Sequence, residues 1–343
     1  MRIIQMMEQN SILITGATGF IGSFIAEEAL RRGMDVWVAV RQTSSREYLQ
    51  DTRIHFLELD LNSTERMMEQ MAGLSFDYVV HAAGITKSTD ASDFYRINTE
   101  GTKNLVQALV HLGINLSRFV YISSLSVCGP VREEVPHTEI KEDDEPQPNT
   151  IYGKSKLLSE QYLESLQAFP FVILRPTGVY GPREKDYFMM AKSIASHIDF
   201  AVGYKPQHLT FVYVQDVVQA VFLAMERDVC GRKFFISDGN AYHSKAFSDL
   251  IKQELGVSSL LRIKAPIWML RVITFVGEHI GRLTGKPTAL NNDKYNIMRQ
   301  RNWKCDITPA KDELGYIPQY DLKDGVHLTM EWYKDNGWIK QTS

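Results

Sequence analysis

The chain has 343 residues, of which 44% are apolar and 23% charged, so it can bury a substantial core in one large or two modest domains. Its net charge of -3 leaves no excess of the cations that binding to a phosphate backbone needs, which excludes nucleic acid as the main partner. Its three cysteines show no paired spacing, so neither a disulfide framework nor a zinc or other metal site is indicated, and we expect a reducing, cytoplasmic setting.

The N-terminal half of the chain alternates short β-branched runs with helical patterns. Residues 1–10 lead into the first run without the apolar core and cleavage site of a signal peptide. Strands that are apolar nearly throughout and separated by helices are typical of a parallel sheet covered on both faces. We therefore predict an α/β fold with a doubly wound, Rossmann-type parallel sheet. The expected strands are residues 11–15, 35–40, 54–59, 77–83, 118–124 and 171–176.

A glycine-rich turn joins the first expected strand to the first expected helix. It contains Gly16, Gly19 and Gly22. Glycines at this spacing allow a tight turn and a close approach to a pyrophosphate, while the free N–H groups at the helix start point at the anion. Such a turn can also be a simple tight connection, but the strand before it and the helix after it favour a dinucleotide site.

The end of the second strand indicates which dinucleotide binds. An NAD site usually has a carboxylate there for the ribose 2′-hydroxyl, whereas NADP needs a cation for the 2′-phosphate. This chain has Arg41, followed by Ser44, Ser45 and Arg46. NADP(H) is therefore favoured and NAD(H) stays possible, because both arginines could instead be solvated surface residues.

Two residues after the third strand could reach the adenine. Asp60 and Leu61 stand at the end of that strand. The alternative is that Asp60 caps the helix that begins near Ser63, a common role for aspartate, and both roles are compatible.

The residue pair Tyr152 and Lys156 follows an acidic, proline-rich segment, residues 127–150, which we expect to be a solvated loop. Their four-residue spacing places both on one face of a helix and is by itself uninformative. That helix follows a strand ending in Ser123 and Ser124, at the sheet edge shared with the glycine turn. Tyr152 then suits an acid/base, with Lys156 lowering its pKa and anchoring the ribose, and Ser124 positioning the substrate oxygen; Ser123 is the near alternative.

From about residue 180 onward helices and short strands mix without a regular rhythm. We therefore predict a dinucleotide-binding domain over residues 1–180 and a smaller substrate-binding lobe over residues 181–343. The lobe would be interleaved with late strands of the sheet and would cap the edge where ligands bind.

Several ordered motifs resemble the extended short-chain dehydrogenase/reductase family, also called the NAD-dependent epimerase/dehydratase superfamily, over nearly the whole chain. They are "TGATGFIG" at 15–22, "HAAG" at 81–84, "NTEGT" at 98–102, "SSLSVCG" at 123–129, "YGKSK" at 152–156 and "LRPTGVYGP" at 174–182. The resemblance implies that Ser124, Tyr152 and Lys156 are catalytic. It also implies a homodimer in which the helix after Asn98 and the helix of Tyr152 pack against their symmetry mates.

The same resemblance implies the rest of the cofactor site. Besides Arg41, Asp60, Leu61, Tyr152 and Lys156, its expected members are the turn residues, the stretch after the fourth strand, a motif asparagine of mainly structural role, and residues near the nicotinamide amide. These are Gly16, Ala17, Thr18, Gly19, Phe20, Ile21 and Gly22; Ala82, Ala83 and Gly84; Asn98; and Pro176, Gly178 and Val179.

The substrate class is the open part of the resemblance. Leu125 and Ser126 stand where nucleotide-sugar dehydratases carry an Asp-Glu pair, which disfavours dehydration. Gly178 stands where many nucleotide-sugar epimerases carry an asparagine. By "VAVR" at 38–41, "RPTGVYGP" at 175–182 and the apolar segment around Trp268, the chain most resembles the branch that holds 3β-hydroxysteroid dehydrogenases, sterol dehydrogenases and dihydroflavonol reductases.

The longest apolar stretch, residues 265–277, predicts an amphipathic helix too short to span a bilayer. Its apolar side chains, from Ile267, Trp268, Met269 and Leu270 to Val272, Ile273 and Phe275, could wall a pocket for a flat apolar substrate. They could also form lobe core or contact a membrane surface.

The leading hypothesis is an NADP-dependent oxidoreductase that interconverts a secondary alcohol and a ketone on a steroid- or flavonoid-like small molecule. The alternative is a nucleotide-sugar epimerase with tightly bound NAD. A third class, a protein that binds the cofactor without catalysis, is disfavoured by the complete set of Ser124, Tyr152 and Lys156.

Overall fold

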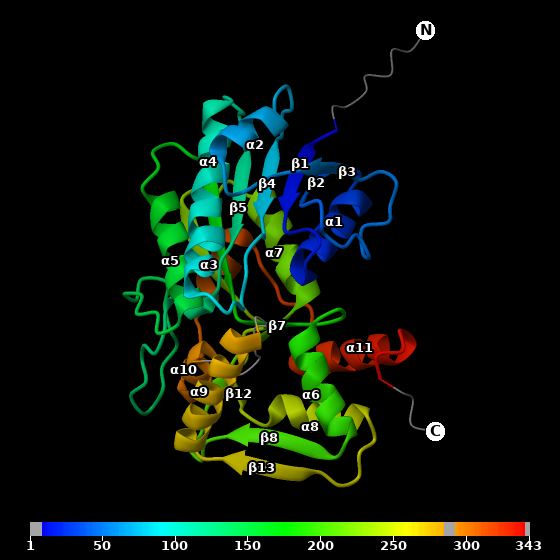
Figure 1. The fold of residues 1–343 in the computed structure, drawn as a ribbon, viewed down its shortest axis with the longest axis vertical. Helices are drawn as coiled ribbons and strands as arrows, with labels where there is room; N and C mark the ends of the chain where they lie inside the picture. The colour runs from blue at the N-terminus through cyan, green and yellow to red at the C-terminus, as the bar shows by residue number, and fades with distance from the viewer. Residues whose placement is uncertain (1–8, 285–291, 340–343) are drawn as a thin grey trace.

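The structure is a computed structural model that describes residues 9–284 and 292–339. A large α/β domain holds the N-terminal half of the chain, and a smaller lobe lies below it in the view of Figure 1. Among the described residues, no helix is both long and apolar enough to cross a membrane.

The large domain is built on a seven-stranded sheet in which all neighbouring strands run parallel. The strand order is β11-β6-β5-β4-β1-β2-β3. From β1, the chain first adds strands on one side of the sheet (β2, β3) and then on the other (β4 onward), and such sheets bind ligands at this switch point between β1 and β4. The predicted doubly wound fold is confirmed. The strands are β1 (Ser11–Thr15), β2 (Asp35–Val40), β3 (His55–Glu58), β4 (Tyr78–His81), β5 (Arg118–Ile122), β6 (Phe171–Pro176) and β11 (Arg232–Ile236).

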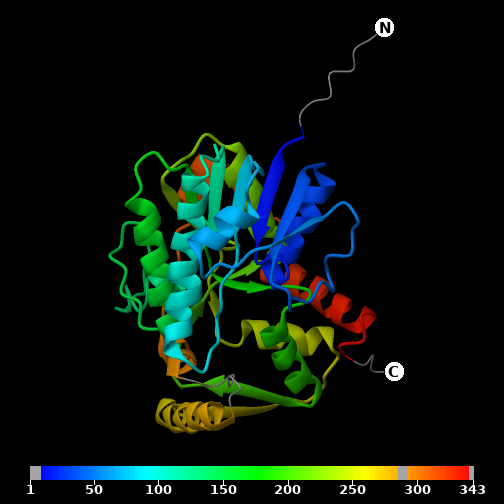
Figure 2. The same ribbon diagram turned by 45° about the horizontal axis from the view of Figure 1, so that its top comes forward.

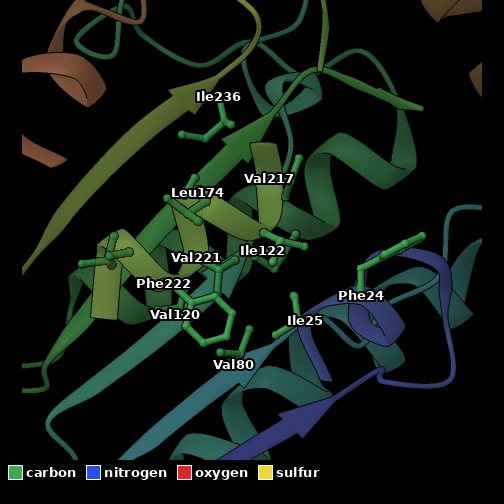
Figure 3. Close-up of a cluster of buried hydrophobic side chains, with 14 of the residues drawn as sticks. Phe24, Ile25, Val80, Val120, Ile122, Leu174, Val217, Val221, Phe222 and Ile236 are labelled. Carbon is green, nitrogen blue, oxygen red and sulfur yellow. The ribbon is translucent and has the colours of Figure 1, made fainter. Parts of the chain in front are cut away.

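Helices cover both faces of this sheet. One face is covered by α1 (Phe20–Arg31) and α7 (Val214–Glu226), and the other by α2 (Thr64–Gln70), α4 (Gly101–His111) and α5 (Ile151–Glu164). A short α3 (Ala91–Phe94) continues through the π-helical turn η1 (Tyr95–Glu100) into α4. Figure 3 shows the core on the α1 and α7 side, where Ile25 and Phe222 pack against strand residues such as Val120. Two buried layers therefore hold the strand ends in fixed positions.

The smaller lobe is assembled from later segments around its own aromatic core, which includes Tyr180, Phe211 and Phe247. Its strands pair as β7 with β10, β9 with β12, and β8 with β13. These strands are β7 (Gly178–Tyr180), β8 (Ile198–Val202), β9 (His208–Leu209), β10 (Phe211–Tyr213), β12 (Tyr242–His243) and β13 (Leu261–Ala265). The helices are α6 (Lys185–Ala195), α8 (Ala246–Glu254), α9 (Ile267–Thr284), α10 (Asn292–Arg299) and α11 (Leu322–Asp335). The chain returns to the large domain between these segments with α7 and β11.

The segment between β5 and α5 is only partly solvated, so the prediction of a solvated loop is wrong at its centre. It begins with the short helical turn η2 (Leu125–Val127). Ile140 is fully buried and forms a parallel bridge with Cys305. Its N–H donates to the Lys304 carbonyl at 2.8 Å. The acidic and proline-rich composition concealed this because the bridging residue Cys305 lies far along the chain, just before the turn η3 (Ala310–Leu314).

Candidate active site

The glycine turn, residues 16–19, lies at the C-terminal end of β1 and leads into α1. The remaining residues of the motif, 20–22, form the first turn of that helix. Gly16 has φ of 73°, and a Cβ there would lie 2.6 Å from the Ala82 carbonyl carbon, so only glycine lets β1 and the β4 loop approach so closely. Gly19 precedes α1 without a side-chain cap. The amides of Phe20 and Ile21 donate to no atom of the described residues. Free donors at a helix start fit a dinucleotide pyrophosphate.

The end of β2 carries one exposed arginine in an ordered turn. The Arg41 N–H donates to Ser44 Oγ at 3.0 Å, and the Ser44 N–H donates to the Arg41 carbonyl at 2.9 Å. The Arg41 guanidinium joins none of the ion pairs found among the described residues. Arg46, by contrast, stacks over the Phe56 ring at 4.2 Å. Arg41 is therefore the better placed of the two for a 2′-phosphate.

Asp60 is occupied by local contacts rather than by capping α2. It accepts from the Asn62 side chain at 2.8 Å and forms an ion pair with Arg66 at 3.1 Å. These contacts hold the pKa of the Asp60 carboxyl below its usual value. Ser63 caps the helix instead, with its hydroxyl accepting from the Arg66 N–H. The capping alternative for Asp60 is wrong, while Leu61 beside it binds Asn104 through its carbonyl.

A buried polar chain that sequence reasoning missed supports the stretch after β4. The Ala83 N–H donates to Thr15 Oγ1 at 3.2 Å, and Thr15 Oγ1 lies 2.6 Å from His81 Nδ1. His81 Nε2 lies 2.9 Å from Thr102 Oγ1. Burial lowers the pKa of His81 to about 3, so the imidazole is neutral and shares its single proton within this chain. These hydrogen bonds hold Ala82 and Ala83 against β1.

Asn98 ties the β4 loop to the helix of the candidate acid/base. It lies in the π-helical turn η1, where its amide exchanges two hydrogen bonds with the backbone of Ile85, at 2.8 and 3.1 Å. Its Nδ2 also donates to Ser155 Oγ at 2.9 Å. Gly84 lies against the side chains of Asn98 and Lys156. Asn98 thus has a structural position rather than one on the reacting atoms.

Tyr152, Ser124 and Lys156 come together at the sheet edge. Burial raises the pKa of the Tyr152 phenol to about 12, and the nearby Ser124 side chain opposes that rise. Lys156 Nζ donates to the Ile122 carbonyl at 2.8 Å and lies 4.6 Å from the centre of the Tyr121 ring. Burial lowers the pKa of Lys156 to about 8, so it is still mainly protonated at neutral pH. The set can hold a proton at the phenol and a positive charge beside it.

The neighbouring serine has a different environment. The Ser123 hydroxyl is buried and donates to Glu160, which forms a buried ion pair with Arg175 at 2.5 Å. Ser123 is therefore committed to this pair, and Ser124 is the serine available to a substrate. Glu160 follows Lys156 by one helical turn, and its charge opposes the lowering of the Lys156 pKa. The sequence analysis did not identify Glu160 or Arg175. The spacing of one helical turn between Lys156 and Glu160 could have indicated that these two residues interact.

A carboxylate from the smaller lobe holds the start of α5, the helix of Tyr152 and Lys156. Asp293, on α10, accepts from the N–H groups of Ile151 and Tyr152 at 3.0 and 3.1 Å. Thr150 caps the same helix through the Gly153 N–H at 2.9 Å. Asn296, also on α10, donates to the Asn149 carbonyl at 2.8 Å. The first turn of α5 is thereby fixed from the lobe side.

The residues after β6 close the site against the lobe. Pro176 ends β6, while Gly178 and Val179 belong to β7. A Cβ at Gly178 would lie 2.8 Å from the Tyr187 hydroxyl and 3.2 Å from the Phe211 ring. The space that an asparagine would need at position 178 is therefore occupied by aromatic side chains.

The predicted amphipathic helix is present as α9, but most of the apolar side chains named for a pocket are exposed. Leu270 is buried, whereas Trp268 and Ile273 face solvent. Val272 and Phe275, with Arg271, Thr274 and Asn292, line an open cavity of about 480 Å³. Cys128, beside the serine segment, is buried with its thiol pKa raised to about 12, as expected for an apolar packing residue. No cluster of potential metal ligands occurs within the described ranges.

A Rossmann-type sheet with a glycine turn and a Ser–Tyr–Lys set at one edge defines an enzyme of the extended short-chain dehydrogenase/reductase class. The sequence profile described as "NAD dependent epimerase/dehydratase family" matches residues 12–237. The chain belongs to this family, and the predicted family and enzyme class are confirmed.

Relatives with different reactions match along almost the whole chain. UDP-glucose 4-epimerase from Vibrio cholerae is 27% identical over 94% of both chains. The decarboxylating sterol-4-alpha-carboxylate 3-dehydrogenase from Candida albicans is 22% identical over 95% of this chain and 98% of its own. The crystal structure of Bordetella bronchiseptica WbmG in complex with NAD has a TM-score of 0.78, with 22% identity over 99% of both chains. This last likeness shows the shared fold.

Proposed function

We propose that the protein is an NADP(H)-dependent oxidoreductase that interconverts a secondary alcohol and a ketone on an apolar small molecule. The observation that carries the proposal is the junction of Tyr152, Ser124 and Lys156 at the sheet edge that also holds the glycine turn. When bound, the nicotinamide supplies or accepts the hydride at the reacting carbon.

The proton step belongs to Tyr152. In reduction its hydroxyl donates a proton to the carbonyl oxygen, and in oxidation the phenolate takes the proton back. Ser124 holds the same oxygen as negative charge develops on it. Lys156 remains mainly protonated at neutral pH, and a cation near the phenol would favour its phenolate form.

The substitution Tyr152→Phe tests this chemistry. It removes the hydroxyl while keeping the ring, so turnover should fall by about a thousandfold or more while the cofactor Kd stays nearly unchanged. Turnover is followed by absorbance of the reduced nicotinamide over a panel of steroid and flavonoid ketones. A variant that keeps most of its activity contradicts the role of Tyr152.

The preference for NADP is supported by the exposed Arg41 at the end of β2. Replacing Arg41 with Ala should weaken NADP+ binding by about tenfold or more and leave NAD+ binding almost unchanged. Arg46→Ala is the matched control, because Arg46 stacks on Phe56. Equal losses for both cofactors, or for both variants, would argue against a 2′-phosphate site at Arg41.

An apolar substrate rather than a sugar nucleotide is supported by the crowding at Gly178. The Tyr187 hydroxyl and the Phe211 ring fill the place of the asparagine that many epimerases use. Thermal shift with apolar ligands and with sugar nucleotides would discriminate between these two substrate classes, because a ligand that binds the native state raises its apparent stability.

The second candidate is a nucleotide-sugar epimerase with tightly held NAD, and the relationship to the Vibrio cholerae enzyme favours it. Purified protein that carries stoichiometric NAD and is stabilised by UDP-sugars would support this candidate. Protein that purifies free of NAD and is stabilised by NADP+ would support the first.

A cytoplasmic homodimer completes the proposal. Val110 on α4 and Leu158 on α5 are exposed apolar residues on the two helices that would pair with their symmetry mates. Light scattering of the wild type and of Leu158→Glu tests the dimer, which the added charge should dissociate.

A further inference from the structure

One end of the smaller lobe exposes large apolar side chains from two different elements. We call it the lobe-end patch and define it by Phe200, Leu261 and Ile263 on β8 and β13 and by Trp268, Val272 and Val276 on α9. In both views β8, β13 and α9 lie together at the end of the molecule farthest from the seven-stranded sheet (Figure 1, Figure 2). An exposed apolar surface of this kind marks a site of interaction.

The strands contribute an apolar outer face. β8 and β13 are parallel partners, with Phe200 opposite Ile263. The alternate residues Asp199 and Arg262 point to the other side, where they pair at 3.1 Å and Asp199 accepts from Ser248 on α8 at 2.9 Å. The polar side chains of this small sheet therefore face the lobe, and the apolar ones face outward, the reverse of an ordinary surface sheet.

The helix repeats this inverted pattern. Trp268, Val272 and Val276 are spaced by four residues, so they form one stripe along α9, and Trp268 is 68% exposed. Leu270 and Thr274, on the opposite side, are 4% and 2% exposed. The helix starts against the end of β8, where a Cβ at Gly203 would lie 3.4 Å from Ile267. The first turn of α9, which carries Trp268, therefore adjoins the end of β8.

Cations accompany the patch. Lys205 and Arg271 are exposed, whereas Lys264 alternates with Ile263 and leaves β13 on the side of Arg262, where it lies 6.0 Å from the centre of the Tyr204 ring. Within residues 198–207 and 261–277 the only acidic residue is Asp199, which is buried and paired. Aromatic and aliphatic side chains with cations beside them match the boundary between the headgroups and acyl chains of an anionic bilayer.

We propose that the lobe-end patch docks the protein on an anionic lipid surface. Apolar side chains would enter the headgroup boundary while Lys205 and Arg271 meet lipid phosphates and carboxylates. A second copy fits less well, because a two-fold interface through this patch would set the same cations against each other. The proposal does not depend on the reaction catalysed, although a docked lobe would place the active site near apolar molecules dissolved in the membrane.

The test is flotation of the purified full-length protein with phosphatidylcholine vesicles, with and without phosphatidylserine. The wild type should float with the anionic vesicles and less with the neutral ones. Trp268→Ser and Phe200→Ser should each weaken binding by about tenfold, and Arg271→Glu by about fivefold or more. Ile317→Ser is the control, because Ile317 is 65% exposed but lies outside the patch.

Three outcomes would overturn the proposal. The wild type could stay unbound on anionic vesicles, or the patch variants could float as well as Ile317→Ser. Light scattering could also show a dimer that Trp268→Ser dissociates, which would make a second copy the occupant of the patch. Unchanged thermal melting and cofactor binding of each variant show that the fold is intact, so failure of this test is distinguishable from failure of the proposed reaction.

Discussion

Asp293 is the residue whose replacement tests how the lobe controls the catalytic helix. Its carboxylate accepts from two N–H groups in the first turn of α5, one of them the amide of Tyr152 itself. Loss of a helix cap costs about 0.5–2 kcal/mol, and the carboxylate also interacts with the helix dipole. Asp293 is partly exposed, so we expect Asp293→Ala to lower the free energy of unfolding by about 1–2 kcal/mol.

The same change should disturb catalysis in a specific way. Freed amides allow the first turn of α5 to shift, and a small displacement of the Tyr152 hydroxyl should lower kcat by about tenfold or more while the KM for the cofactor stays nearly constant. Asp293→Asn keeps one acceptor oxygen and should recover part of the loss. Steady-state kinetics and urea unfolding measure the two effects.

The matched control is Asp321→Ala. Asp321 caps α11 by accepting from the Asp324 N–H at 2.8 Å, so its loss should cost similar stability without touching α5. If Asp293→Ala loses stability as Asp321→Ala does but keeps the wild-type kcat, Asp293 is only a structural cap and the reasoning is refuted.

Three further predictions concern His81, Glu160 and Gly178. In the unfolded chain His81 is protonated below its ordinary pKa of 6.5, whereas in the folded protein it is protonated only below a pKa of about 3. Between these two pH values the free energy of unfolding should therefore fall by about 1.4 kcal/mol for each pH unit of acidification. His81→Gln should flatten this acid limb when the free energy of unfolding, measured in urea, is plotted against pH. Glu160→Gln should cost about 3–5 kcal/mol by leaving Arg175 unpaired and should move the basic limb of the activity profile to lower pH; an unmoved limb would show that Glu160 does not act on the lysine. Gly178→Asn should destabilise by about 1–3 kcal/mol, and adding Tyr187→Phe should restore part of the melting temperature; no restoration would mean that the hydroxyl is not the obstacle.

The sequence was sufficient for features whose signals are local. Gly16 and its neighbours, the strand at Ser11–Thr15 and the pair Tyr152 and Lys156 each carry their pattern within a few residues. The doubly wound sheet followed from the alternation of such patterns. The wall of aromatic side chains at Gly178 could not follow, because it depends on how the lobe packs.

Contacts between distant segments were out of reach for the same reason. Asp293 lies 141 residues from Tyr152, and nothing in its local sequence marks it as the partner of a helix start. The burial of Ile140 likewise depends on its bridge with the distant Cys305. The exposure of Trp268 reversed the expectation of pocket or core, because periodicity identifies an apolar face but does not indicate what covers it.

The charges beneath the active site form a single balance. Lys156 and Arg175 bring two buried cations to the ends of β5 and β6, and Glu160 brings one buried anion that Ser123 and Arg175 share. Glu160 pairs with Arg175, and its charge also opposes the lowering of the Lys156 pKa, so it partly balances both cations. One net positive charge remains, and under the proposed roles it favours negative charge on the phenol of Tyr152 and on a substrate oxygen held at Ser124. Because these charges belong to the sheet and α5, we expect changes in the lobe to alter the substrate without altering the proton step.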